Sequence, residues 1–222
     1  NVNMLYVLEN NGVYGLTKGQ FSASTDVGST ARKGGAVNQQ PPIDAVLTAI
    51  NFGCTFVARG FSGDKQNLVP LLKAAILHPG FAMLDVLSPC VTFNDHEGST
   101  KSYAYTRESE RTTVYADFIP SREPIETDLI KDVTTVTLHD GSRIALRKVD
   151  DDYNPFDAGA ATAYLRDHQE QGEIVTGLLY MDEEAQDLHA MNNTPNTPLN
   201  ALEPSKLIPG AAKLTALQKA WR

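Results

Sequence analysis

The chain has 222 residues, 41% hydrophobic and 21% charged, which is typical of a soluble globular protein with one large domain, or one domain and an extension. Its 19 Lys and Arg residues against 27 Asp and Glu residues leave a net charge of −8. This charge argues against a nucleic-acid-binding protein, because no large positive field would neutralise phosphates. No apolar run approaches the ~18–20 residues of a membrane-spanning helix, so we expect no membrane protein.

The two cysteines, Cys54 and Cys90, are too few for a disulfide framework. The first residues do not resemble a signal peptide, so a reducing, cytoplasmic location is expected. Neither cysteine belongs to a C-x-x-C pair, and the chain alone therefore provides no complete metal site.

The first predicted element is a buried strand over residues 2–8, a run of apolar, β-branched and aromatic side chains. It ends at the polar cluster of residues 9–12. Residues 12–42 contain six glycines and many Ser and Thr residues, which predicts a long irregular loop with one short helical turn. Ordered loops of this length are usually functional.

Helices then alternate with continuous apolar strands. Amphipathic periodicity predicts helices over residues 44–51 and 64–77, and apolar runs predict strands over residues 54–58 and 81–87. Strands without polar alternation are typical of a sheet that is covered on both faces. This alternation predicts an α/β fold with a mostly parallel sheet flanked by helices.

The pattern changes after Pro89. A hairpin is predicted over residues 133–149, with its turn at Asp140-Gly141. The other expected elements are helices over residues 99–111 and 157–171, a strand over 174–180, an extended arm over 192–209 and a final helix over 211–221. In the turn at residues 59–64, Ser62 or Asp64 is expected to cap the helix that follows.

The segment from Glu9 to Gln20 follows a predicted parallel strand, at the sheet edge where ligands bind in open α/β folds. Its short amides, backbone carbonyls and glycines suit Mg²⁺ and a diphosphate, because this ion prefers oxygen ligands and commonly takes phosphate oxygens among them. On local composition alone, a solvated turn remains the alternative, since Asn-Gly is a common turn dipeptide.

Residues 1–24, NVNMLYVLENNGVYGLTKGQFSAS, closely resemble the thiamine-diphosphate loop in the β subunit of 2-oxoacid:ferredoxin oxidoreductases, particularly the 2-oxoglutarate branch. Four further matches follow in the same order, at residues 56–64, 88–94, 96–101 and 199–206. The resemblance is dense up to about residue 105 and returns near the end of the chain. It implies a thiamine-diphosphate-binding fold.

The resemblance implies roles for individual residues. The Asn11 side chain and the backbone carbonyl of Val13 match two Mg²⁺ ligands, and diphosphate oxygens and water would complete the sphere with an upstream Asp. Leu16 stands where pyruvate-specific relatives carry a polar residue, which favours another substrate. The implied cofactor-binding residues are Asn11, Gly12, Val13, Tyr14, Gly15, Leu16 and Thr17.

Cys90, in the sequence Ser-Pro-Cys, resembles the lone distal ligand of a [4Fe-4S] cluster, which four thiolates bind. Without the resemblance, a small buried hydrophobic residue would be the better interpretation of Cys90. We keep that interpretation for Cys54.

The family's upstream Gly-Asp-Gly and C-x-x-C motifs are absent from this sequence. We therefore expect the chain to be the downstream part of a larger subunit whose upstream segment is elsewhere. Residues 1–125 are assigned to the C-terminal part of the thiamine-diphosphate-binding domain. Residues 126–222 are assigned to an extension and arm that pack on the same subunit or its partner.

The implied activity is oxidative decarboxylation of a 2-oxoacid, with 2-oxoglutarate favoured, to its acyl-CoA and reduced ferredoxin. An α subunit would be the partner, and the acid/base group is expected outside this chain. A basic patch that meets acidic ferredoxin could include Lys101, Arg107 and Arg111. The alternatives are a pyruvate or branched-chain 2-oxoacid enzyme, and a non-catalytic interaction subunit of the same fold.

Overall fold

The computed structural model describes residues 1–30, 35–119, 133–138, 141, 143–208 and 210–221. The chain forms two compact units, Asn1–Asp187 and Leu188–Arg222. The predicted boundary at residue 125 falls within residues 120–132, outside the described residues, and stays a prediction.

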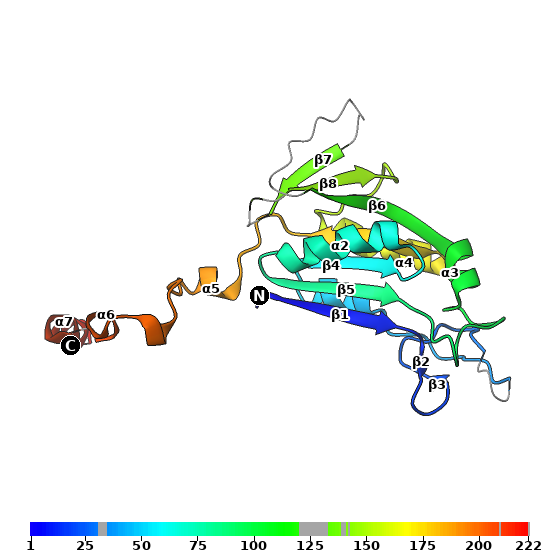
Figure 1. Ribbon diagram of the computed structural model, residues 1–222, viewed down its shortest axis with the longest axis horizontal. Coiled ribbons are helices and arrows are strands. Elements are labelled where there is room, and N and C mark those ends of the chain that lie inside the picture. Colours follow the sequence, from blue (N-terminus) through cyan, green and yellow to red (C-terminus); the bar gives the residue numbers. More distant parts are fainter. Residues whose placement is uncertain (31–34, 120–132, 139–140, 142, 209, 222) are drawn as a thin grey trace. The chain divides into compact units, whose positions relative to one another are not determined.

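The first unit is built on a mixed sheet with the strand order β1-β5-β4-β9-β6-β8-β7 (Figure 1). Three neighbouring pairs are parallel, β1 with β5, β5 with β4, and β9 with β6, while the other three are antiparallel. The strands are β1 (Met4–Asn10), β4 (Phe56–Phe61), β5 (Phe81–Leu87), β6 (Glu110–Ile119), β7 (Val133–Thr137), β8 (Arg143–Lys148) and β9 (Ile174–Met181).

Helix α2 (Lys65–Leu77) packs on one face of the sheet and α4 (Ala158–Glu170) on the other (Figure 1). Helix α1 (Ala45–Asn51) contacts α4 and strands β4 and β5. An aspartate immediately before each of these three helices accepts hydrogen bonds from free backbone N–H groups of the first turn. The predicted α/β fold is confirmed, and Asp64 caps α2 as one of the two expected residues.

Strand β1 differs from its prediction in two ways. It continues to Asn10, where residue 8 was the expected end, because its register with β5 extends to Leu87. It is also largely exposed, since β5 is its only neighbour among the described residues. The exposed fractions are 49% for Met4, 51% for Tyr6 and 44% for Val7. Successive side chains point to opposite faces, so both faces of this edge strand carry exposed apolar groups.

The middle of the chain contains a strand, β6, that was not predicted from the sequence. Helix α3 (Tyr103–Ser109) is shorter than the predicted helix over residues 99–111, and Glu110 already begins β6. β6 lies between β9 and β8, so its pairing partners are distant in the sequence. The predicted strand over residues 54–58 also shifts, because Cys54 precedes β4.

The loop over residues 12–42 contains a small hairpin, β2 (Val13–Tyr14) with β3 (Gln20–Phe21), and a bridge between Thr30 and Val37. No helical turn occurs in its described part, so that prediction was wrong there.

The C-terminal elements of the first unit follow their predictions. β7 and β8 form an antiparallel hairpin, and α4 and β9 occupy the expected positions. Gly141 in the hairpin turn has a φ of +79°, while Asp140 lies outside the described residues.

The second unit carries four short or exposed helices, and none of their described residues is buried. They are α5 (Leu188–Met191), the 3₁₀ helix η1 (Leu199–Ala201), α6 (Pro204–Leu207) and α7 (Gly210–Ala220). The expected final helix is therefore confirmed, and the expected arm contains short helical turns. Within the described residues, no helix has both the length and the apolar character required to cross a membrane.

Candidate functional site

The loop over residues 11–19, here called the β1 loop, stands where three parallel strands end. β1, β5 and β4 run in the same direction, so their carboxyl ends meet at one edge of the sheet. The β2–β3 hairpin lies beyond the end of β1 at this edge (Figure 1). Ligands of open α/β sheets bind outside the carboxyl ends of the strands. The β1 loop therefore has the position expected for a ligand-binding loop.

The first residues of the β1 loop have a fixed geometry. Asn11 Oδ1 accepts a hydrogen bond of 3.0 Å from the Val13 backbone N–H, and Gly12 adopts a φ of +68°. Ser22 N–H donates to the Gly12 carbonyl at 3.4 Å, which makes Gly12–Ser22 a hydrogen-bonded pair of the hairpin. Such pairs alternate with non-bonded ones in antiparallel ladders, so the Val13 carbonyl points away from its hairpin partner Phe21.

The second half of the β1 loop faces outward. Tyr14 is 56% exposed and Leu16 99% exposed, and the Thr17 hydroxyl donates to the Tyr14 carbonyl at 3.2 Å. Gly12 and Val13 are buried by contrast. The residues proposed for cofactor binding thus form one continuous loop with a buried base and an exposed tip.

Residues 88–101, here called the backing segment, support the β1 loop from behind. Asn94 Nδ2 donates to the Asn11 carbonyl at 2.8 Å. A Cβ on Gly12 would lie 2.9 Å from Lys101 Cγ and 3.3 Å from Asn94 Nδ2. Gly12 therefore needs to be glycine both for its φ and for the close approach of the backing segment.

The two cysteines lie at opposite ends of β5. Cys90 is half-buried in the backing segment, and its Sγ lies 3.9 Å from the position of a Cβ on Gly15. The Cys54 thiol is buried and donates to the carbonyls of Phe56 and Phe81, at the amino end of β5. Burial raises the pKa of the Cys54 thiol. Cys54 therefore behaves as a structural residue, and Cys90 is the cysteine beside the β1 loop.

Two oxygen atoms of the β1 loop fit part of an Mg²⁺ site. Asn11 Oδ1 has a second lone pair beyond its hydrogen bond to Val13, and the Val13 carbonyl oxygen points out of the hairpin. Both are oxygen ligands of the kind that Mg²⁺ prefers. Within the described ranges, no group of three or more His, Cys, Asp or Glu side chains could hold a metal ion. These two donors would therefore need further ligands from a diphosphate and from other protein segments.

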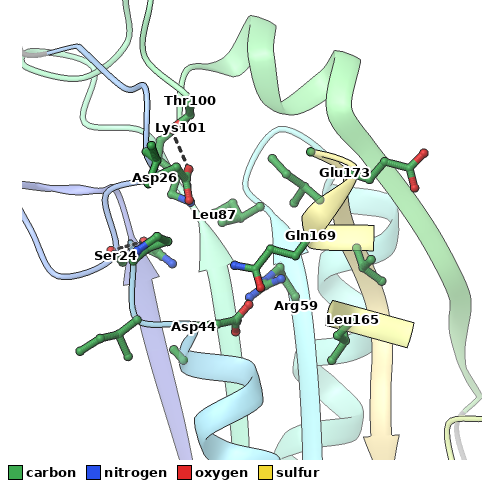
Figure 2. A pocket seen from close by; sticks show the side chains of 18 of the residues that line it. Ser24, Asp26, Asp44, Arg59, Leu87, Thr100, Lys101, Leu165, Gln169 and Glu173 are labelled. Carbon is green, nitrogen blue, oxygen red and sulfur yellow. Dashed lines mark hydrogen bonds and ion pairs between the residues drawn. The ribbon is translucent and has the colours of Figure 1, made fainter. Parts of the chain in front are cut away.

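Next to the β1 loop is a cleft of about 320 Å³, lined by residues from β1, α1, β4, the backing segment and α4. Arg59 of β4 lies at its base and pairs with two carboxylates, Asp44 at 3.0 Å and Asp85 at 2.8 Å. Figure 2 shows Arg59 and Gln169 facing Asp44, with the Lys101–Asp26 pair on the far side. The cleft thus has charged walls whose charges are already partnered.

Burial alone would raise the pKa of Asp44, but the Arg59 guanidinium and the N–H groups of Leu47 and Val46 hold it below its usual value. Asp44 is therefore ionised at neutral pH, both as the cap of α1 and as a partner of Arg59. This carboxylate joins the start of α1 to the centre of the sheet.

The structure corrects one residue of the predicted ferredoxin patch. Lys101 is only 8% exposed, and its Nζ pairs with Asp26 Oδ2 at 2.9 Å, so it is unavailable to a docking protein. Arg107 contacts the rings of Phe61 and Tyr103, and Arg111 pairs with two acidic residues. Lys101 therefore drops out of the predicted patch, while the exposed Arg107 and Arg111 stay a prediction.

Several site residues were missed from the sequence, among them Asp26, Asp44, Asp85 and Asn94. A signal existed for one group: Arg59 stands within an apolar strand, and a buried arginine requires acidic partners. The identity of those partners depends on the tertiary fold.

Part of the chain is similar to known proteins. Residues 1–86 match the family described as "Thiamine pyrophosphate enzyme, C-terminal TPP binding domain". The "2-oxoacid:ferredoxin oxidoreductase subunit beta" of Saccharolobus solfataricus is 41% identical over 126 residues, 56% of this chain and 39% of the relative. The "2-oxoglutarate oxidoreductase subunit KorB" of Mycobacterium tuberculosis is 37% identical over 95 residues, 43% of this chain and 26% of the relative.

A solved structure extends the similarity to nearly the whole chain. The 2-oxoglutarate:ferredoxin oxidoreductase from Magnetococcus marinus, with 2-oxoglutarate, coenzyme A and succinyl-CoA bound, superimposes with a TM-score of 0.61 at 25% identity. The match covers 98% of this chain and 58% of that chain. By sequence and by fold, this chain is similar to part of the β subunits of 2-oxoacid:ferredoxin oxidoreductases, and its residues 1–86 match the thiamine-pyrophosphate-binding family.

Proposed function

We propose that the chain serves as the thiamine-diphosphate-binding part of a 2-oxoacid:ferredoxin oxidoreductase β subunit. The observation that carries this proposal is the β1 loop, which presents Asn11 and the Val13 carbonyl at the carboxyl end of β1 in a chain with these relatives. The chain spans 39% of the length of its Saccharolobus relative. The proposed active enzyme therefore includes an upstream β segment and an α subunit.

In the proposed site, Asn11 Oδ1 and the Val13 carbonyl would hold Mg²⁺. Thiamine diphosphate bound there would supply the electron-accepting chemistry that makes decarboxylation of a 2-oxoacid feasible. This chain's contribution is to position the cofactor. The Asx turn at Asn11 and the positive φ of Gly12 set the loop's shape through contacts within this chain.

We further propose that Cys90 is one of four thiolates that bind a [4Fe-4S] cluster, with the other three on the upstream segment. The support is its position: Cys90 is half-buried under Gly15 of the β1 loop. A cluster bound there would lie next to the proposed cofactor loop, which suits transfer of electrons from the cofactor site toward ferredoxin.

The favoured substrate is 2-oxoglutarate, with coenzyme A as the acyl acceptor, ferredoxin as the electron acceptor and the cytoplasm as the location. Several similar proteins are named for 2-oxoglutarate, among them those of M. tuberculosis and M. marinus. The apolar Leu16 at the exposed loop tip is consistent with a substrate other than pyruvate.

A substrate panel tests this function directly. The subunit, assembled with its upstream segment and α subunit, is expected to reduce ferredoxin with 2-oxoglutarate and coenzyme A at a higher kcat/KM than with pyruvate or a branched-chain 2-oxoacid. The measurement is the anaerobic change in ferredoxin absorbance. A preference for pyruvate would contradict the substrate assignment, and no turnover with any 2-oxoacid would favour a non-catalytic subunit.

Replacing Asn11 tests the proposed metal ligand. Asn11→Ala is expected to weaken binding of Mg²⁺ and thiamine diphosphate by at least about tenfold, the lower end for loss of an outer-shell partner of a metal site. Asn11→Asp keeps an oxygen ligand and should stay close to the original affinity. Isothermal titration of the assembled enzyme provides the measurement.

Asn51→Ala is a matched control, because it removes an exposed amide of α1 that bonds the Leu47 carbonyl. It should leave cofactor affinity unchanged. Equal affinities for Asn11→Ala and Asn51→Ala would remove Asn11 from the metal site.

A further inference from the structure

We propose that Asn94 is a positioning residue that fixes the β1 loop relative to Cys90. This inference rests on the proposed function, in which Asn11 is a magnesium ligand and Cys90 is a cluster ligand. Asn94 belongs to the backing segment and is only 2% exposed.

Asn94 bonds Cys90 through its backbone and Asn11 through its side chain. Its backbone N–H donates to the Cys90 carbonyl at 2.7 Å, and its side-chain Nδ2 donates to the Asn11 carbonyl at 2.8 Å. The Asn94 side chain is buried and its two partners are partly buried, so an unpaired amide or carbonyl group here would be costly. A single buried residue thus connects the proposed magnesium ligand to the proposed cluster ligand.

Asn94 is itself held in place. The Ser99 hydroxyl donates to the Asn94 carbonyl at 3.0 Å, and Ser99 Oγ accepts from the Lys101 backbone N–H at 3.2 Å. The stem of Lys101 lies against Gly12, while its Nζ pairs with Asp26. The backing segment therefore contacts the base of the β1 loop twice, through Asn94 at Asn11 and through Lys101 at Gly12.

The consequence is a loop whose shape is set before the cofactor binds. Asn94 holds the Asn11 carbonyl, and Asn11 Oδ1 holds the Val13 N–H, so both proposed ligand residues have fixed backbones. Preorganisation of this kind raises affinity by reducing the ordering cost of binding. The hydrogen bond from Asn94 to the Cys90 carbonyl also fixes the backbone of the proposed cluster ligand.

Asn94→Asp tests this role with little change in side-chain volume. An ionised carboxylate cannot donate to the Asn11 carbonyl, whereas the backbone bond to Cys90 remains possible. In the assembled enzyme without cofactor, amide hydrogen exchange over residues 11–19 should accelerate by about tenfold, the effect of losing one buried hydrogen bond. The dissociation constant for Mg²⁺ and thiamine diphosphate should rise by a similar factor.

Thr113→Val is the control, since it removes a buried hydrogen bond to the Thr176 carbonyl, between β6 and β9, without touching the β1 loop or the backing segment. Its exchange and affinity should stay within about twofold of the original enzyme. If Asn94→Asp fails to assemble, Asn94→Ser replaces it, because serine keeps the backbone N–H but is too short to reach Asn11.

A spectroscopic readout tests the link to Cys90. With Mn²⁺ in place of Mg²⁺, magnetic coupling between Mn²⁺ and the reduced cluster reports the distance between them. We expect Asn94→Asp to broaden or shift this coupling and Thr113→Val to preserve it. Unchanged exchange, affinity and coupling in an Asn94 variant would overturn the inference, whereas an original enzyme that binds no cofactor or cluster would overturn the proposed function instead.

Discussion

Arg59→Met is expected to destabilise the chain by about 3–5 kcal/mol, the usual cost of removing one partner from a buried ion pair. Arg59 has an 11% exposed side chain and bonds Asp44 and Asp85, of which Asp85 is fully buried. Methionine fills similar space but leaves two carboxylates in the interior without a cation. Denaturant unfolding of the original chain and of Arg59→Met at neutral pH measures the difference in the free energy of unfolding.

The pH dependence gives an independent check of the same pair. In the original chain the pKa of Asp44 is lowered, so its stabilisation is present above an unfolded pKa near 3.8 and is lost as the pH falls through the lower folded value. In Arg59→Met, burial raises the pKa of Asp44 without the opposing effect of the guanidinium. Protonation of Asp44 then removes a buried, unpaired charge and stabilises the variant. The difference in stability should therefore begin to shrink above pH 3.8, where Asp44 of the variant is already taking up a proton, and should continue to shrink as the pH falls further.

Asp44→Asn serves as the control in a double-mutant cycle, because asparagine also caps helices but carries no charge. Adding it to Arg59→Met should recover part of the lost stability. If the two substitutions were simply additive, the Arg59–Asp44 pair would not be the source of the effect.

The second large effect is expected for Gly177→Ala in β9, at about 3–5 kcal/mol. Gly177 has a φ of +100°, and a Cβ there would lie 2.4 Å from the Val114 backbone oxygen of β6. The cost combines a strained φ with a collision against backbone that cannot rotate away. The register of β6 with β9 shifts between Thr112 and Val114, which is where Gly177 pairs.

Gly172→Ala provides the comparison, since Gly172 has a φ of +78° but no atom within 4 Å of the added Cβ. It should cost only the φ strain, about 1–2 kcal/mol. Thermal unfolding of both variants separates the two contributions. Equal melting temperatures would show that β6 moves aside without cost.

The first part of the fold was predictable because its signals are local. Asp44 and Asp64 mark helix starts, and the apolar run at residues 81–87 coincides with β5. β6 was missed because residues 99–111 favour a helix locally, while the pairing of Glu110 onward with β9 is set by a partner more than sixty residues away. A strand that depends on distant pairing leaves a weaker local pattern.

The candidate site was predictable only in part, for a related reason. The β1 loop could be found because its residues are contiguous and resemble a known family. The contacts that support it, Asn94 on Asn11 and Lys101 on Asp26, join segments over seventy residues apart. Lys101 illustrates the consequence: its sequence position suggested a surface cation, but tertiary packing buried it.

The exposed edge of β1 has a practical consequence for handling this chain. On one side β1 has no strand partner among the described residues, and it carries apolar side chains on both faces, so that side can pair with another extended segment. A purified preparation of the chain alone would therefore self-associate as its concentration rises. Co-expression with the proposed partner segments should suppress this aggregation by occupying the edge before another copy does.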